Sequence, residues 1–185
     1  MTAELSRLLN ALALIALDTV LVLAFVDQLW FGDLPCPLCI LQRAGFFAAG
    51  FGIALNLFFG PKPSHYGIAI LGAVAGGCIS MRQILLHIVP GTGSYGEAIF
   101  GLHLYTWAFV AFGLTIVGCA VMLLDDRQFS RAEPMSMRLK VLPLMAVLLF
   151  LVLAITNVAS TVALCGAGFC PDSPKDYMLF ETNPI

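Results

Sequence analysis

The chain has 185 residues, of which 60% are hydrophobic and 11% are charged, and its mean hydropathy is +0.96. A single water-soluble domain of this length lacks the interior to cover so much apolar surface, so the composition excludes that class and predicts a membrane protein. The formal net charge of -2 comes from few, scattered charges, which excludes the basic surface that nucleic-acid binding requires.

Five apolar stretches are long enough to cross a hydrocarbon core as helices, each of which takes about 20 residues. The first is expected to be retained and not cleaved as a signal peptide, since it is long, contains Asp18 and is not closed by an Ala-x-Ala site. The breaks between stretches carry glycine and proline or polar runs. The chain is therefore predicted to be an all-α polytopic helical bundle. The expected spans are residues 9–31, 39–59, 66–89, 102–124 and 139–163.

The distribution of lysine and arginine predicts the orientation of the bundle, because these residues are retained on the cytoplasmic side near the ends of spans. Lys175 alone lies outside the spans on the side opposite the N-terminus. The N-terminus is thus expected in the cytoplasm and the C-terminus outside, so that Cys36, Cys39, Cys165 and Cys170 share one outer compartment. The residues on the N-terminal side are Arg7, Lys62, Arg127, Arg131, Arg138 and Lys140.

Cys36-Pro37-Leu38-Cys39, at the entrance to the second span, has three possible interpretations: a structural disulfide, half of a metal site, or an exchangeable redox couple. Spacing alone does not decide among them. A structural disulfide is disfavoured, because a disulfide across so short a loop removes little conformational entropy from the unfolded chain. A zinc site would need more ligands, and the outer loops offer only Cys165, Cys170 and His103. We therefore favour thiol–disulfide chemistry and expect no metal.

Polar residues in the second and third spans are expected near this cysteine pair. Arg43 follows the second cysteine by one helical turn on the same face, where a guanidinium can stabilise a thiolate or an anionic ligand. A charge within a span is costly enough to suggest a function, although an interfacial arginine that reaches the headgroups is the alternative. Arg82 lies at a similar depth, so two cations are expected to converge here. Further hydrogen bonds could come from Gln42, Gln83 and His87. For His87, an ordinary packed or interfacial histidine is an equally good interpretation.

A second cysteine couple, Cys165 and Cys170, begins the outer tail after the fifth span. The glycines between the two give a loop that can close a disulfide. Two couples in one oxidising compartment suggest an electron relay through mixed disulfides, with a structural staple as the alternative. Cys78 and Cys119 lie at different depths of two spans, so we expect them not to pair and to serve as small packing residues inside the bundle.

The motif around the first couple resembles a known family. Residues 36–43 match the C-x-L-C-x-x-x-R signature of the DsbB-type disulfide-forming membrane proteins. Further matching features are Arg82-Gln83 near the end of the third span, and Gly101-Leu102 followed by Trp107 at the start of the fourth. The resemblance covers about residues 1–125.

This resemblance implies a four-helix bundle that reduces a membrane quinone, either ubiquinone or menaquinone. It implies that Cys39 is the thiolate beside the quinone, that Arg43 is its electrostatic partner, and that Cys36 exchanges with the second couple. The residues assigned to quinone binding are Arg43, Arg82, Gln42 and Gln83.

The chain also departs from the family pattern. In the family the second couple lies in a long outer loop between the third and fourth spans, whereas here residues 90–101 contain no cysteine. A fifth span instead ends next to Cys165 and Cys170, so we infer that the second couple has moved to the tail. The predicted organisation is a DsbB-like core, a cytoplasmic linker, a fifth span and a periplasmic tail, at residues 1–125, 126–138, 139–163 and 164–185.

Together these observations predict a quinone-dependent thiol oxidase of the bacterial inner membrane. A periplasmic thioredoxin-fold, DsbA-like dithiol would be oxidised by the tail couple, and its electrons would pass to the first couple and then to quinone. The reach of the tail suggests that Cys165 approaches Cys36 in a water-facing loop, while Cys170 meets the partner. The alternatives are a membrane reductase of the opposite direction, a non-enzymatic bundle or transporter with structural disulfides, and an enzyme like vitamin K epoxide reductase, which fits less well.

Overall fold

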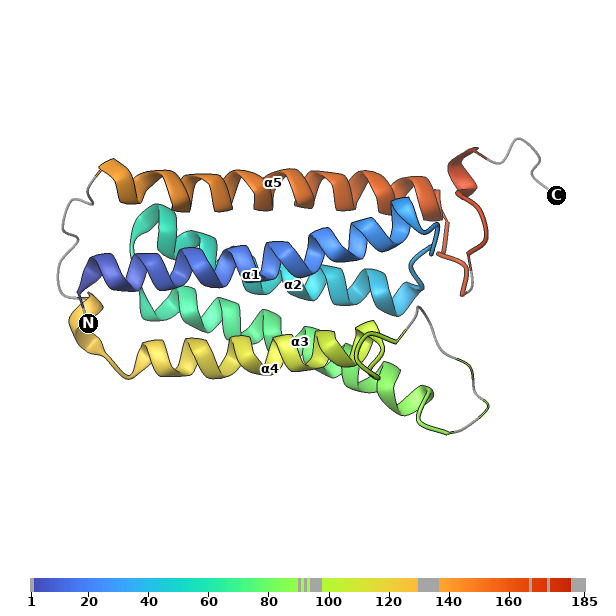
Figure 1. Cartoon of the computed structure of the whole chain (residues 1–185), viewed down its shortest axis with the longest axis horizontal. Helices are drawn as coiled ribbons and strands as arrows, with labels where there is room; N and C mark the ends of the chain where they lie inside the picture. Colours follow the sequence, from blue (N-terminus) through green and yellow to red (C-terminus); the bar gives the residue numbers. More distant parts are fainter. Residues whose placement is uncertain are drawn as a thin grey trace.

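The computed structural model describes residues 2–89, 91, 93, 98–129, 137–166, 168–172 and 174–180. Within these residues five long helices run side by side along the long axis of the molecule (Figure 1), and all five are apolar and long enough to cross a membrane. This confirms the predicted polytopic helical bundle. The helices are α1 (Ala3–Trp30), α2 (Pro37–Phe59), α3 (Pro63–Leu86), α4 (Leu104–Leu123) and α5 (Met137–Cys165), with two short 3-10 turns, η1 (Asp126–Phe129) and η2 (Met178–Phe180).

Local sequence signals fix where the helices begin. α1 begins at Ala3 and not at residue 9, because the Thr2 hydroxyl caps it by accepting a hydrogen bond from the Leu5 N–H at 3.3 Å. α2 and α3 begin with Pro37 and Pro63, at the first helical position, where the missing N–H removes no helical hydrogen bond. Hydropathy alone therefore placed the spans correctly but not their ends.

Glycines allow α2 and α3 to approach each other closely. A Cβ added to Gly72 of α3 would lie 2.5 Å from the backbone nitrogen of Ala49, and one added to Gly52 of α2 would lie 2.5 Å from that of Ala69. Within a membrane, lipid chains are as apolar as the helix surfaces, so association depends on such close packing. These contacts set the rotation of α3 about its own axis and so decide which of its residues face α2.

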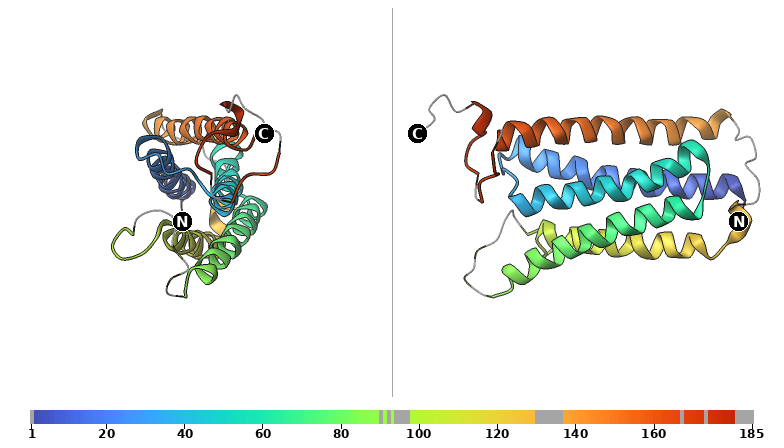
Figure 2. Two further views of the ribbon diagram at one scale, coloured as in Figure 1. Left: turned by 90° about the vertical axis from the view of Figure 1, so that its right-hand side faces the viewer. Right: turned by 180° about the vertical axis from the view of Figure 1, so that it is seen from behind.

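Two of the remaining helices, α4 and α5, contact this pair on different sides. The ring of Phe112 on α4 stacks on Phe46 of α2, with ring centroids 4.1 Å apart. α5 lies mainly along α1, and its Phe150 reaches the ring of Phe47 on α2 at a centroid distance of 5.6 Å. Figure 2 shows α5 at the edge of the group formed by α1 to α4. The fifth helix is thus added to one side of a four-helix core.

The two ends of the bundle differ in composition. At one end, a buried polar network joins α1, α2, α3 and η1. Ser6 donates to Gln128 Oε1 at 2.7 Å, Asn10 Nδ2 donates to the Tyr66 hydroxyl at 2.7 Å, and Asn56 Nδ2 donates to Asn10 Oδ1 at 3.0 Å. These bonds satisfy polar groups that would be costly to leave unpaired, and they hold the start of α1 against its neighbours. Sequence reasoning did not identify this network.

The other end, called here the Cys36 end, carries the sulfur chemistry. The end of α1, the start of α2, the end of α5 and the tail that follows α5 all meet there (Figure 1). The tail turns back so that η2 packs against α5. Both cysteine couples are therefore positioned at the same end of the bundle, as the relay hypothesis requires.

Candidate active site

The start of α2 fixes the geometry of Cys36 and Cys39, which are both free thiols. Cys36 is the N-cap residue, and its Sγ accepts a hydrogen bond from the Cys39 N–H at 3.2 Å. Its side chain is consequently turned over the helix start and is 3% exposed, whereas Cys39 is half-buried. The expectation that Cys36 lies in a water-facing loop is wrong, because capping draws its thiol into the protein.

The surroundings of Cys36 favour its protonated form. Its pKa is raised above the ordinary value, first by a hydrogen bond with the Cys39 side chain and then by burial. The hydrogen bonds from the Cys39 N–H and from Gln83 act in the opposite direction and are smaller effects. Cys36 is therefore a thiol that keeps its proton and shares it with the sulfur next to it.

Two glutamines close one side of the dithiol. Gln83 of α3 is fully buried, and its Nε2 donates to Cys36 Sγ at 3.4 Å and to Cys39 Sγ at 3.6 Å. Its Oε1 accepts a hydrogen bond of 2.6 Å from Gln42 Nε2. The structure thus brings four of the predicted site residues into one connected group. Their part in catalysis stays a prediction.

Arg43 approaches the same region from α2 but is held by α1. Its Nη1 donates to Gln28 Oε1 at 2.6 Å and its Nη2 donates to the Ala24 carbonyl at 2.8 Å, while the guanidinium lies 4.8 Å from the ring centroid of Phe25. The side chain is 7% exposed. These contacts rule out an arginine that extends to the headgroups. They leave a buried cation fixed near the dithiol by hydrogen bonds and a cation–π contact.

Gln28 is a site residue that sequence reasoning missed. A glutamine in an otherwise apolar span was the available signal, since a buried amide needs partners. The identity of those partners depends on how α1 packs against α2, which the sequence pattern does not specify.

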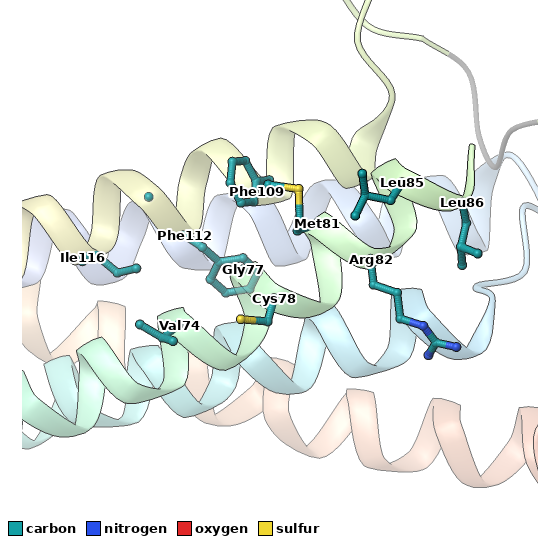
Figure 3. A pocket seen from close by; sticks show the side chains of 11 residues that line it. Val74, Gly77, Cys78, Met81, Arg82, Leu85, Leu86, Phe109, Phe112 and Ile116 are labelled. Atoms are coloured by element: carbon teal, nitrogen blue, oxygen red, sulfur yellow. The ribbon is translucent and has the colours of Figure 1, made fainter. Parts of the chain in front are cut away.

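Arg82 does not join the site, so the expected convergence of two cations near Cys39 is wrong. It is exposed and lines a groove of about 620 Å³ between α3 and α4, together with Cys78 and Phe109 (Figure 3). Successive helical residues point about 100° apart. Because Gln83 faces the dithiol, Arg82 points to a different side of α3, toward the exposed groove.

A cavity of about 480 Å³ lies between α1, α2 and α4 at the Cys36 end. Cys36, Cys39 and Arg43 form part of its wall, and α4 contributes Tyr105 and Trp107. Most of the remaining wall is aliphatic or aromatic. A concave, largely apolar space with a few convergent polar groups is the usual form of a small-molecule site. Here those groups are the dithiol, the Arg43 cation, the Gln42 amide and the carboxyl groups of Asp27 and Asp33.

Comparisons with known proteins agree with this arrangement. The model of the family described as Disulfide bond formation protein DsbB matches residues 6–94. Disulfide bond formation protein B of Marinobacter nauticus is 31% identical over 155 positions, which cover 64% of this chain and 92% of that relative. The chain belongs to the DsbB family.

Two further relatives of the same name support this membership. The protein of Nitrosomonas eutropha is 32% identical over 110 positions, covering 55% of this chain and 68% of the relative. That of Chromobacterium violaceum is 37% identical over 71 positions, covering 36% and 43%. No solved structure shows significant similarity to the chain. The protein is thus a multi-pass membrane protein and a disulfide-forming oxidoreductase.

The part of the chain that matches the DsbB family model excludes the second cysteine couple. The match ends at residue 94, before α4 and α5. In the structure Cys165 and Cys170 form a disulfide. Cys165 is the last residue of α5 and is buried, Cys170 is half-buried, and Gly166 between them has a φ of 59° that ends the helix. The tail of this DsbB-family chain therefore carries an oxidised couple next to a helix end.

The two remaining cysteines differ from each other. Cys119 is buried in the core and Cys78 is exposed, and both are free, as expected for residues at different depths. The prediction that both are packed inside the bundle is confirmed for Cys119 and wrong for Cys78. Cys78 lies in the groove with Arg82, on the face of α3 that turns away from α2.

Two further titratable residues of the described chain, His87 and Asp18, do not contact the dithiol or line its cavity. His87 hydrogen-bonds the Gln83 carbonyl through Nδ1 at 2.8 Å, and its ring lies 5.6 Å from that of Tyr105. Asp18 is fully buried in α1, and neither of its carboxyl oxygens has a hydrogen-bond partner among the described residues. Within that part of the chain, no cluster of histidine, cysteine or acidic residues could hold a metal ion.

Proposed function

We propose that this DsbB-family protein is a quinone-dependent thiol oxidase of the bacterial inner membrane, which passes disulfides to a periplasmic thioredoxin-fold, DsbA-like protein. One observation carries the proposal. The Cys36–Cys39 dithiol and the buried guanidinium of Arg43 line one largely apolar cavity between α1, α2 and α4. A lipid-soluble quinone, with an apolar ring and two polar oxygens, fits the chemistry of that wall.

In this proposal the residues around the cavity carry out a two-electron exchange. The dithiol loses two electrons and two protons and closes to the Cys36–Cys39 disulfide, while a quinone is reduced to a quinol. Quinone supplies the electron acceptance, and the protein supplies position and charge. Arg43 is placed to stabilise negative charge as it develops on a thiolate or a quinone oxygen. Gln83 holds both sulfurs in reach of the cavity.

The tail couple extends the reaction to soluble proteins. The Cys165–Cys170 disulfide oxidises a partner dithiol and is itself reduced, and the Cys36–Cys39 disulfide then restores it through a mixed disulfide. Each partner disulfide therefore corresponds to one quinol. Cys36 is 3% exposed, so its sulfur must become accessible before a thiolate of the reduced tail couple can attack the Cys36–Cys39 disulfide. We assign the Cys36 end to the periplasmic side because lysine and arginine concentrate toward the opposite end.

The proposal is tested by quinone reduction with purified protein, quinone and a reduced thioredoxin-fold protein. Quinone absorbance should fall with the wild-type chain, and Cys39→Ser should abolish the change, since its sulfur hands electrons to the quinone. Cys78→Ser is the matched control, because that cysteine lies in the groove outside the site, and it should react at the wild-type rate. Quinol that instead reduces the partner's disulfide would indicate the reductase direction and overturn the proposal.

A further inference from the structure

Gln28 connects the cavity to the C-terminal tail. It lies on α1, is 2% exposed, and its Oε1 accepts the hydrogen bond from Arg43 Nη1 at 2.6 Å. Its Nε2 donates to the Ser160 hydroxyl on α5 at 2.7 Å and to the Tyr177 hydroxyl in the tail at 3.0 Å. A single buried amide thus bonds to α2, α5 and the tail at once.

The chemistry of these partners fixes which way the amide faces. Arg43 can only donate, so the carbonyl oxygen of Gln28 must face it, and the amide nitrogen must face the other way. Ser160 and Tyr177 then act as the acceptors that satisfy this nitrogen. A rotated amide would set an N–H against the guanidinium and lose the bond to Arg43, whereas the two hydroxyls, which can donate or accept, can bond either end of the amide. Arg43 therefore sets the orientation of the amide, and the hydroxyls of α5 and the tail hold the amide in the position where it meets Arg43.

Tyr177 is held in place by the fold of the tail. Its ring packs edge-on against Phe180 at a centroid distance of 6.3 Å, and η2 packs against α5. A Cβ added to Gly166, in the turn between Cys165 and Cys170, would lie 3.9 Å from Met178 Cβ. The tail thus folds back over the turn that contains the second couple.

We propose that Gln28 is a positioning residue for Arg43, and that the docked tail holds Gln28 in position through Tyr177. Quinone binding then depends on a part of the chain that lies outside the cavity: the tail that carries the second couple also keeps the cavity's cation in place. The inference rests on the proposed quinone reaction.

The first test separates quinone binding from turnover. Tyr177→Phe removes one hydroxyl and keeps the ring, and Gln28→Leu removes the whole connection. Loss of one such hydrogen bond should raise the KM for quinone about 3- to 10-fold, with kcat at saturating quinone changed less than about twofold. Thr156→Val is the control, since among the described residues that hydroxyl donates to the Val152 carbonyl of its own helix and to no residue of the site. Wild-type quinone KM in both test variants would overturn the proposal.

The second test needs no quinone, so it distinguishes this inference from the proposed function. Coupling between two sites is reciprocal, so Arg43→Lys and Gln28→Leu should speed amide hydrogen exchange in residues 174–180 by about 3- to 10-fold. Thr156→Val should not. Unchanged tail exchange in both variants would overturn the coupling. If the wild-type chain reduces no quinone yet tail exchange rises, the connection stands and the proposed function fails.

Discussion

Replacing Gln83 with leucine separates the chemical role of this residue from its structural one. Gln83 donates to both sulfurs and accepts from Gln42, and it is fully buried. Leucine is similar in size but forms none of these bonds. The variant therefore leaves the buried Gln42 amide without its acceptor and the two sulfurs without their side-chain donor from α3.

The two consequences have different magnitudes. An orphaned buried donor costs about 1–3 kcal/mol, so Gln83→Leu should destabilise the protein by that amount. A hydrogen bond to a charged acceptor contributes about 1 kcal/mol more than one to a neutral acceptor, which corresponds to about a fivefold change in the ratio of thiolate to thiol. Alkylation of the reduced dithiol by N-ethylmaleimide at neutral pH should therefore slow about fivefold, because the thiolate is the reactive form.

A double variant provides the control. Replacing both partners of a buried hydrogen bond with apolar groups is nearly neutral, so Gln42→Leu/Gln83→Leu should recover most of the stability in a detergent unfolding titration. Its alkylation should stay as slow as in Gln83→Leu. Gln42→Leu alone should lose stability and alkylate at the wild-type rate. If Gln83→Leu alkylates as fast as wild type, Gln83 is only a packing partner of Gln42.

Three further predictions follow from the packing and the site. Gly72→Ala places a Cβ 2.5 Å from the α2 backbone and should lower the free energy of unfolding, measured by thermal unfolding, by about 1–3 kcal/mol. Gly67→Ala, with open space around it, should lower it little. Equal losses in the two variants would refute the close-packing account. Arg43→Ala should raise the quinone KM, and Arg43→Lys should raise it less. Arg82→Ala should leave the quinone KM unchanged. An effect of Arg82→Ala as large as that of Arg43→Ala would contradict the position of Arg82 outside the cavity. Cys165→Ser should accumulate a covalent adduct with the partner on a non-reducing gel. If this variant oxidises the partner at the wild-type rate, the Cys165–Cys170 disulfide has only a structural role.

The sequence was sufficient for the parts of the structure that depend on distance along a helix. A hydrocarbon core demands long apolar segments, so five spans could be located from hydropathy. Residues spaced by one turn share a face, so Cys39 and Arg43 were correctly expected to line one region. The glycines between Cys165 and Cys170 correctly indicated a loop that closes a disulfide.

Features that depend on helix rotation and on contacts between distant segments were not predictable in this way. Arg82 and Gln83 are neighbours in sequence, and only the packing of α3 through its glycines decides that Gln83 faces the dithiol and Arg82 faces outward. Cys78 was misplaced for the same reason. Cys36 was misplaced because capping is a local hydrogen bond that hydropathy does not report. The role of Gln28 could not be predicted from the sequence, because it depends on where both α5 and the tail lie.

The most direct test of the central claim is the stoichiometry of the coupled reaction. Purified protein is mixed without oxygen with limiting reduced thioredoxin-fold partner and excess quinone, and the quinol and the partner disulfide are quantified in the same sample. With protein in catalytic amounts, the account predicts one quinol for each partner disulfide in the wild-type chain, and no quinol with Cys36→Ser/Cys39→Ser, whose tail disulfide can oxidise at most one partner per chain. Partner disulfides formed without an equal amount of quinol would contradict it.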